Sequence, residues 1–382
     1  MGPSGIVPDV HQMSRPKRQH VETVLARVRQ GVKLSSRETT LLLGLCEEDQ
    51  IEAVFKAARD VRRTHFGEKV FLYGFVYFST YCRNDCTFCS FRRSNRKCWR
   101  YRKEEAEILE AACQLAASGV HLIDLTMGED PEYFCKGPSG FDKLVRLVES
   151  VGKATGLPAM ISPGVVPDDV LGALARVGAT WYACYQETHR RALFNQLRPG
   201  QSYDARLEKK ILARKLGLLI EEGLLTGAGE SIDDVAHSIY VMGALNADQV
   251  RVMSFIPQRG TPMEGWASPD RLRELLTIAV MRLVFPERLI PASLDVDGLS
   301  GLKHRLDAGA NVVTSLVPPD CGLAGVSQNS LDIKNSRRTT AGVLPVLKEC
   351  GLKVGDSADY GVWVDSRRRA AKGESFTGQV TC

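Results

Sequence analysis

Short apolar runs alternate with amphipathic segments along most of the chain. The first strong apolar run, "KVFLYGFVYFS" at Lys69–Ser79, is rich in β-branched and aromatic residues and predicts a buried parallel strand. A helical pattern follows at Lys103–Ser118, and a second apolar strand is expected at Val120–Thr126. The alternation continues to a final helix at Thr339–Gly351 and gives eight strand–helix pairs.

This alternation predicts the fold class. Strands that alternate with helices favour a parallel sheet, and eight such units favour a single closed (β/α)8 barrel of TIM type. The alternative is an open doubly wound sheet, but the GxGxxG turn typical of that fold is absent after the first strand. We therefore expect a barrel at residues 67–352, preceded by an extension at 1–66 with two helices within Arg37–His65. Residues 353–382 would form a C-terminal segment.

Charge and hydropathy exclude several classes of partner. The 382-residue chain has a net charge of +5, and the stretch from Ser366 to the end carries +3 of it. The rest of the chain is close to neutral and lacks the excess of basic residues that is typical of nucleic-acid-binding proteins. No apolar run could span a bilayer, and the first twenty residues lack the apolar core of a signal peptide. We expect a cytoplasmic protein with no nucleic-acid or membrane partner and a basic, disordered tail.

Three of the eleven cysteines lie directly after the first predicted strand. The stretch "YCRNDCTFC" places Cys82, Cys86 and Cys89 at C-x3-C-x2-C spacing. In a parallel barrel this position is the C-terminal face, where active sites form. An odd cysteine count without a secretion signal favours free thiols and metal ligands over disulfides.

Three thiolates suit an iron–sulfur or zinc site. Electron-transfer [4Fe–4S] clusters take four cysteines, so three would leave one iron open to a substrate or cofactor. The alternative adds Cys98 as a fourth ligand and closes a zinc or cluster site. In its zinc form, that alternative makes the chain a non-catalytic binding or structural protein.

The cysteine motif resembles that of the radical S-adenosylmethionine superfamily, in which an aromatic residue, here Phe88, precedes the third cysteine. The resemblance implies that the three cysteines hold a [4Fe–4S] cluster whose open iron chelates S-adenosylmethionine. One electron would then split the sulfonium and give a 5'-deoxyadenosyl radical that takes hydrogen from the substrate. A reducing electron donor such as flavodoxin or ferredoxin is implied as a partner.

Further stretches resemble cofactor-binding motifs of this superfamily, in the same order. "TMGEDP" stands where the family has GGE, with Met127 in place of the first glycine, and "ISPG" ends the third strand. "YQETHRRALFNQLRPGQSYDAR" resembles the ET…LF…P…S…R stretch of the biotin synthase and hydrogenase-maturase branch, and "GLLTGAGES" fits a GxIxGxxE pattern. By this resemblance the cofactor would be held by Gly128, Glu129, Ser162, Glu187, Arg206, Leu225 and Gly227. Without this resemblance, Glu187 and Arg206 would be interpreted as a surface ion pair that contributes little to stability.

Polar side chains on later strands predict a zwitterionic substrate. Arg251 lies on the sixth strand, while Ser293 and Asp295 are two residues apart on the seventh and should both point into the barrel mouth. An arginine can fork onto a carboxylate, and an aspartate can pair with an ammonium. Asp124 on the second strand offers another anion, which suits a substrate with two amines and one carboxylate. The alternative is an internal Arg–Asp pair that only stabilises the barrel.

These stretches resemble the methylornithine synthases of pyrrolysine biosynthesis, over about Leu34–Gly351. The resemblance implies an isomerase that converts L-lysine to (2R,3R)-3-methylornithine by breaking the Cα–Cβ bond and rejoining the fragments. A sealed barrel would keep both fragments in place. The substrate residues implied are Asp124, Arg251, Ser293 and Asp295.

One alternative stays within the superfamily. It is a biotin-synthase-like or hydrogenase-maturase-like enzyme with another small amino-acid-like substrate. Biotin synthase needs ligands for a second cluster, and Cys184 and Cys321 are the candidates for that role here.

Overall fold

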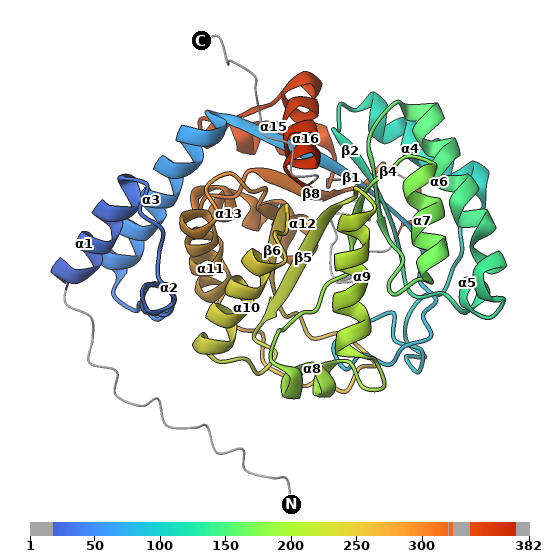
Figure 1. Ribbon diagram of the computed structural model, residues 1–382, viewed down its shortest axis with the longest axis horizontal. Coiled ribbons are helices and arrows are strands. Elements are labelled where there is room, and N and C mark those ends of the chain that lie inside the picture. Colours follow the sequence, from blue (N-terminus) through green and yellow to red (C-terminus); the bar gives the residue numbers. More distant parts are fainter. Residues whose placement is uncertain (1–17, 320, 324–336, 372–382) are drawn as a thin grey trace, which may run out of the picture.

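A parallel β-barrel forms the centre of the computed structural model, which describes residues 18–319, 321–323 and 337–371 (Figure 1). Eight strands run in the order β6-β5-β4-β3-β2-β1-β8-β7. They are β1 Lys69–Ser79, β2 Leu122–Met127, β3 Ala159–Ser162, β4 Ala179–Ala183, β5 Leu219–Thr226, β6 Gln249–Ser254, β7 Pro291–Ser293 and β8 Val312–Leu316. A bridge between Gln249 and Leu289 joins β6 to the start of β7, so the barrel is nearly closed. The predicted barrel is confirmed, and the open-sheet alternative is wrong.

Helices surround the barrel because each offers an apolar face to the strands. In α6, for example, Leu144, Leu147, Val148 and Val151 are buried at helical spacing. The outer helices are α4 Glu105–Ala117, α6 Asp142–Thr155, α7 Asp168–Arg176, α9 Tyr203–Lys215, α10 Ile232–Ala244, α11 Arg271–Val284, α13 Leu302–Asp307 and α15 Thr340–Glu349. Shorter helices follow strand ends: α5 Pro131–Phe134, η1 Gly137–Phe141, α8 Arg191–Leu197, α12 Leu294–Asp297 and η2 Gly298–Gly301.

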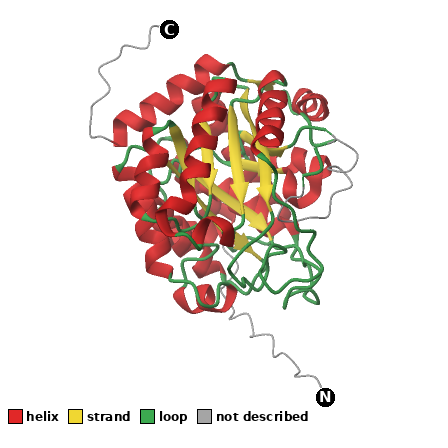
Figure 2. Ribbon diagram, turned by 90° about the vertical axis from the view of Figure 1, so that its right-hand side faces the viewer, coloured by secondary structure: helices red, strands yellow, loops and turns green. Residues whose placement is uncertain are grey.

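Strand β1 is buried on both faces, which explains its continuous apolar sequence. Tyr73 and Tyr77 point into the barrel, whereas Leu72 and Val76 pack in the layer between strands and helices. Figure 2 shows the strands running towards the end of the molecule where loops gather. That end is the C-terminal face predicted to carry the site.

In the described part of the chain, three helices precede the barrel: α1 Arg18–Arg29, α2 Ser36–Leu43 and α3 Glu48–Phe66. The sequence predicted α2 and α3 but not α1. They lie beside α10 and α11 at the left of Figure 1 and so thicken one side of the helical layer. Arg62 links α3 to α13, because its Nη1 donates to the carbonyl oxygen of Leu306 at 2.5 Å.

The C-terminal segment covers the opposite end of the barrel from the loops. After the two-residue strand β9 Lys353–Val354, helix α16 Ser357–Ala371 packs across the strand beginnings. The rings of Trp363 and Trp181 stack with centroids 5.9 Å apart. Disorder was predicted from Ser366 onward, but residues 366–371 are helical and Arg367 pairs with the buried Asp248 at 2.8 Å. The predicted start of the disordered tail is therefore wrong. The remaining tail lies outside the described residues.

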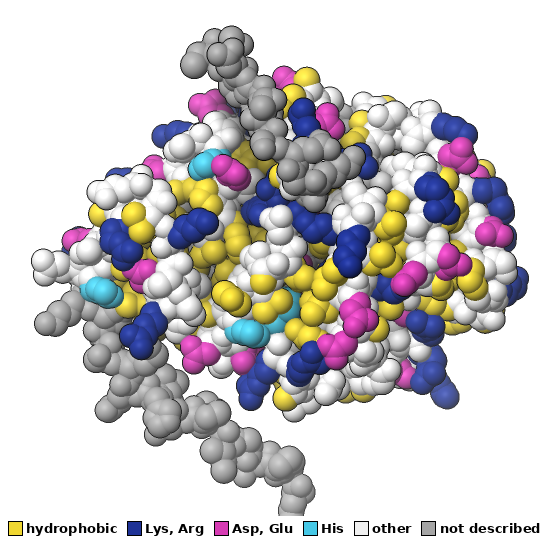
Figure 3. Space-filling model, viewed as in Figure 1, with side chains coloured by type: hydrophobic (Ala, Val, Ile, Leu, Met, Phe, Trp, Pro, Cys, Tyr) yellow, Lys and Arg dark blue, Asp and Glu magenta, His cyan; other side chains and the backbone are white. Residues whose placement is uncertain are grey.

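The molecular surface carries charges of both signs. On the face drawn in Figure 3, acidic and basic side chains are interspersed. None of the described helices combines the length and the hydrophobicity needed to cross a membrane.

Candidate active site

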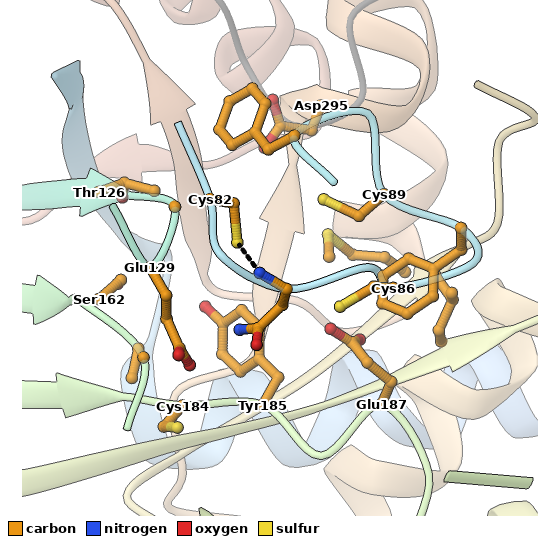
Figure 4. Close-up of a pocket in the computed structure, with 18 of the residues that line it drawn as sticks. Cys82, Cys86, Cys89, Thr126, Glu129, Ser162, Cys184, Tyr185, Glu187 and Asp295 are labelled. Atoms are coloured by element: carbon orange, nitrogen blue, oxygen red, sulfur yellow. Dashed lines mark hydrogen bonds between the residues drawn. The ribbon is translucent and has the colours of Figure 1, made fainter. Parts of the chain in front are cut away.

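A cavity of about 200 Å³ opens at the C-terminal end of the barrel (Figure 4). All three cysteines of the motif line it, together with side chains from the ends of several strands. Residues predicted for the site that line this cavity are Cys82, Cys86, Cys89, Phe88, Gly128, Glu129, Ser162, Glu187, Arg206, Leu225, Asp124, Arg251 and Asp295. Ser293 and Gly227 do not line it.

The cysteine loop is held by neighbouring loops, because it has no regular secondary structure of its own. The backbone N–H of Arg83 donates to Glu129 O at 2.8 Å, and that of Thr87 donates to Leu197 O at 2.9 Å. The loops after β2 and β4 thus fix the positions of the thiols.

The three cysteines are free thiols, of which Cys86 is buried and Cys82 and Cys89 are partly buried. Burial raises the pKa of Cys82 to about 11 and that of Cys89 further still. The Cys86 Sγ accepts hydrogen bonds from Gln201 Nε2 at 3.0 Å and from Arg198 Nη1 at 3.5 Å. These two donors fix the position of the Cys86 sulfur at the cavity.

Gly128 brings β2 against the cysteine loop. A Cβ atom at this position would stand 2.2 Å from the carbonyl oxygen of Tyr81, so only glycine fits. The next residue, Glu129, is buried and accepts from Arg83 Nε at 2.9 Å and from Val165 N–H at 3.1 Å. Its carboxylate therefore ties the loop after β3 to the cysteine loop.

Glu187 and Arg206 are both buried at the cavity but do not pair with each other. Glu187 Oε1 binds Arg198 Nη2 at 2.6 Å, whereas Arg206 donates to Cys184 Sγ at 2.7 Å and to Glu129 Oε1 at 3.4 Å. The surface-pair alternative is therefore wrong. Burial raises the pKa of Glu187.

Glu187 adopts a backbone conformation that is unusual for its type, with φ at +66°. It bridges to β5, since its N–H donates to Gly223 O and its carbonyl accepts from Leu225 N–H. Such strain is found where a site holds a side chain in place. The bridge thus couples Glu187 to Leu225 at the cavity wall.

Gly227 lies beyond the cavity, in the turn after β5. Its N–H donates to Glu230 Oε1 at 2.7 Å, and the N–H of Ala228 donates to Glu230 Oε2 at 2.9 Å. Ser231 then caps α10 by accepting from Asp234 N–H. The "GLLTGAGES" stretch therefore builds a strand-to-helix turn whose first residues reach the cavity.

Four residues that line the cavity have a buried polar atom without a hydrogen-bond partner in the described part of the chain: Arg198 Nε, Arg206 Nε, Asp124 Oδ2 and Arg251 Nη2. Asp124 Oδ2 is the one acceptor among them, and Arg251 Nη2 is the one terminal guanidinium nitrogen. Asp124 Oδ1 accepts from Thr126 at 2.9 Å and from Ser162 at 3.1 Å. Burial raises the Asp124 pKa to about 7. Unpaired buried polar atoms are costly, so a ligand that satisfies both Asp124 Oδ2 and Arg251 Nη2 would bind favourably.

Arg251 pairs with Glu221, a residue that sequence analysis missed. Its Nε donates to Glu221 Oε1 at 2.7 Å and its Nη1 to Thr314 at 3.1 Å. Tyr185 donates to the other Glu221 oxygen at 2.6 Å. The sequence feature that could have revealed Glu221 is the pair of adjacent glutamates in the apolar strand "LLIEEGLLTG". Because successive side chains of a strand point to opposite faces, one of the two had to face the barrel interior.

Asp295 reaches the cavity from α12, not from β7. The strand ends at Ser293. The prediction that Ser293 and Asp295 both point into the barrel mouth from one strand is therefore wrong. Ser293 is buried and its Oγ accepts from the Asp295 N–H at 3.3 Å. Asp295 itself accepts from Tyr77 at 2.9 Å, from Ser315 at 2.8 Å and from Arg338 at 2.8 Å.

Ser315 and Arg338 were not predicted for the site. Ser315 has φ at +67° and lies where the pairing of β8 with β1 changes register. Arg338 is fully buried just before α15 and far from β7 in sequence. Neither position carries a periodic or motif signal that could have revealed it.

Comparisons with known proteins agree with this geometry. The family model of the radical SAM superfamily matches residues 76–239. A 3-methylornithine synthase from Methanosarcina barkeri is 42% identical over 334 residues, which cover 87% of this chain and 94% of the relative. The chain belongs to the radical SAM superfamily.

Two further matches refine this placement within the radical SAM superfamily. A crystal structure of methylornithine synthase superposes with a TM-score of 0.84 at 42% identity, covering 89% of this chain and 99% of that chain. The [FeFe] hydrogenase maturase subunit HydE of Thermotoga maritima is 31% identical over 69% of this chain and 74% of its own length.

The cysteine arrangement fits the [4Fe–4S] cluster that radical SAM membership implies. Among the described residues, no three His, Cys, Asp or Glu side chains converge on a single metal-ion position. A cluster differs because each thiolate binds a different iron, so its ligands surround a larger space. Cys98 is not part of this lining, and its Sγ contacts its neighbour's carbonyl, Trp99 O, at 3.5 Å.

The two candidate ligands for a second cluster lie apart in this radical SAM barrel. Cys184 lines the cavity, where its Sγ contacts Arg206. Cys321 instead contacts Gln114 on α4, outside the cavity lining. The geometry of the described residues thus gives the second-cluster alternative no support.

Proposed function

We propose that this radical SAM enzyme is an isomerase that converts L-lysine to (2R,3R)-3-methylornithine. The observation that carries the proposal is the pair of unpartnered polar atoms, Asp124 Oδ2 and Arg251 Nη2, in the cavity beside the three cysteines. One is an acceptor and the other a cationic donor, as a zwitterionic amino acid requires. The 42% identity to 3-methylornithine synthase supports the choice of substrate.

The proposal assigns separate tasks to the two sides of the cavity. When bound, the [4Fe–4S] cluster and S-adenosylmethionine would supply a 5'-deoxyadenosyl radical that removes one hydrogen from lysine. The cluster would be held by Cys82, Cys86 and Cys89. S-adenosylmethionine would contact the cofactor side, formed by Phe88, Gly128, Glu129, Ser162, Glu187, Arg206 and Leu225, with Gly227 shaping the turn behind Leu225.

On the substrate side, Arg251 would bind the carboxylate and Asp124 an ammonium group. Asp295 would offer a second negative charge, with Ser293 fixing its backbone. The Cα–Cβ bond would break and the fragments rejoin at the neighbouring carbon. The hydrogen would then return, so the product has the mass of lysine. Phe75 and Tyr185 line the same cavity and would keep water away from both fragments.

The test is an anaerobic assay of the reconstituted full-length protein with S-adenosylmethionine, L-lysine and a chemical reductant. Mass spectrometry after an isomer-resolving separation should detect a new compound of lysine's mass. We expect Cys86→Ala to abolish both this product and 5'-deoxyadenosine. Arg251→Met should abolish the product but leave slow cleavage of S-adenosylmethionine.

The same assay can show that the radical chemistry is correct while the assignment of lysine as substrate is wrong. If lysine stays intact while wild-type protein forms 5'-deoxyadenosine, the radical chemistry stands and the lysine assignment fails. The substrate would then be another small amino-acid-like molecule, in line with the similarity to the hydrogenase maturase subunit.

A further inference from the structure

Two surface segments beside the cysteine loop form a basic patch, which we call the basic rim. It consists of residues 92–99 and 259–266. Between Phe91 and Glu104 the sequence holds seven Lys or Arg residues and no Asp or Glu. Four of the seven, Arg92, Arg93, Arg96 and Lys97, lie in the rim, and Arg259 joins them from the second segment. Glu264 and, in the cysteine loop, Asp85 offset part of this charge, so the rim keeps an excess of positive charge.

The two segments of the basic rim are joined into one surface. Asn95 Nδ2 donates to Ser90 O and to Arg259 O, both at 2.9 Å. Lys97 Nζ lies 3.3 Å from Glu264 Oε2. A partner would thus meet a preformed surface, which lowers the ordering cost of binding.

The basic rim adjoins the loop that carries the three cysteines. The Arg92 N–H donates to Cys89 O at 3.2 Å, and the Arg93 N–H donates to Asn84 O at 2.7 Å. The second segment approaches the cavity too, because Trp266 packs edge-on against Phe255, which lines it. A protein docked on the rim would therefore lie next to the cluster site.

The exposed side chains of the rim are those typical of interface hot spots. Trp99 is 61% exposed and Trp266 is 49% exposed, although both are large and apolar. Arg96 and Arg259 are exposed, and neither forms a direct ion pair among the described residues, although Glu264 attracts Arg259 from a greater distance. The pair Lys97–Glu264 is exposed and would be displaced at little cost.

We propose that the basic rim docks an acidic electron-transfer protein. A radical SAM cluster needs one electron for each cleavage, so the donor is oxidised by one electron and the cluster is reduced by one. An acidic donor would be steered to the rim by complementary charge. The proposal rests on membership of the superfamily and not on lysine as substrate.

The test measures binding of the reconstituted full-length enzyme to a bacterial flavodoxin, used as the acidic probe, by anaerobic biolayer interferometry. Wild-type affinity should fall as salt rises. The double variant Arg96→Glu/Arg259→Glu should weaken the Kd about tenfold or more. Trp99→Ala should also weaken it, without any change of charge.

A matched double variant provides the control. Arg29→Glu/Lys56→Glu reverses two exposed charges on α1 and α3, at the left of Figure 1, and should leave the Kd within about twofold. Iron content and circular dichroism should match wild type in every variant. In the rim variant, flavodoxin-driven formation of 5'-deoxyadenosine should slow while dithionite-driven formation stays unchanged.

Several outcomes would overturn the proposal. One is an unchanged Kd in the rim variant, and another is equal weakening in the control. A third is rim-dependent binding of a single-stranded RNA oligonucleotide, or rim-dependent self-association, in place of flavodoxin binding. None of these results would bear on the conversion of lysine.

Discussion

Four buried carboxylates line the cavity, and two of them, Asp124 and Asp295, differ in their hydrogen-bond partners. Asp295 is surrounded by donors and by the Arg338 guanidinium, whereas Asp124 keeps one oxygen without a partner. A carboxylate that is already paired with an arginine has less to gain from a substrate ammonium. Asp124 is therefore the residue at which substrate binding should depend most on protonation.

We expect the KM for lysine to rise as pH falls from about 8 to about 6. The folded-state pKa of Asp124 is about 7, so below this pH the carboxyl is neutral and cannot pair with an ammonium. Asp124→Asn should show a high KM at both pH values. Steady-state kinetics of product formation across this range checks the prediction.

Stability measurements on the apo protein provide the control for this variant. The folded-state pKa of Asp124, about 7, exceeds the ordinary value of 3.8. Between these two pH values the folded state therefore binds more protons than the unfolded chain does. Asp124 thus lowers stability as pH rises through this interval. Asn cannot ionise, so Asp124→Asn should not lower the Tm at about pH 8. A large drop there would mean that the higher KM reflects a damaged fold.

Arg338 should contribute strongly to stability through Asp295. Arg338→Met would leave the Asp295 carboxylate buried without its cation, which costs about 3–5 kcal/mol. Asp295→Asn in the same chain removes that charge and should recover part of the loss. Urea unfolding of both single variants and the double variant gives the coupling energy. Strictly additive effects would contradict the role of Arg338 as the compensating cation.

At the scale of elements, the site depends on contacts between the segments that follow different strands. The loop after β1 receives its fixed points from the loops after β2 and β4, through Glu129 and Leu197. The cysteine loop has no regular secondary structure of its own, so its shape depends on these neighbours. Changes at these contacts should therefore affect cluster binding before they affect the barrel.

Gly128→Ala tests this dependence. The added Cβ would collide with the carbonyl oxygen of Tyr81 and push the cysteine loop away from β2. We expect reconstituted iron content to fall to less than about half of wild type, with a Tm loss corresponding to about 1–3 kcal/mol. Gly152→Ala on α6 is the matched control, because no atom lies within 4 Å of its new Cβ. Normal iron content in Gly128→Ala would show that the loop does not need this contact.

At the scale of the whole molecule, the repeat of strands and helices could be predicted because both periodicities are strong. β1 was placed at its observed bounds, and α4 at Glu105–Ala117 lies within the helix expected at Lys103–Ser118. The short strand β7 was less predictable because Pro291 begins it and α12 follows at once. Side-chain pairing was less predictable still, since partners such as Arg338 lie far away in sequence.

The cysteine motif and the order of the later motifs carried most of the site prediction. They identified residues that approach the cavity but not the contacts among them. The pairing of Arg251 with Glu221 depends on two strands lying side by side, which a single sequence pattern does not encode. The role of α16 was missed for a similar reason, because its apolar residues match the barrel end only in three dimensions.

Helix α16 should stabilise the whole barrel by closing the end where the strands begin. Tyr360 is buried there against Phe71 and Tyr73, and its hydroxyl lies 2.8 Å from that of Tyr73. Tyr360→Ala would leave a cavity at the strand beginnings and should cost about 3–5 kcal/mol in urea unfolding. Val362 on the same helix is 64% exposed, so Val362→Ala should change stability by less than about 0.5 kcal/mol. If both variants unfold like wild type, α16 is an appendage and the barrel is stable without it.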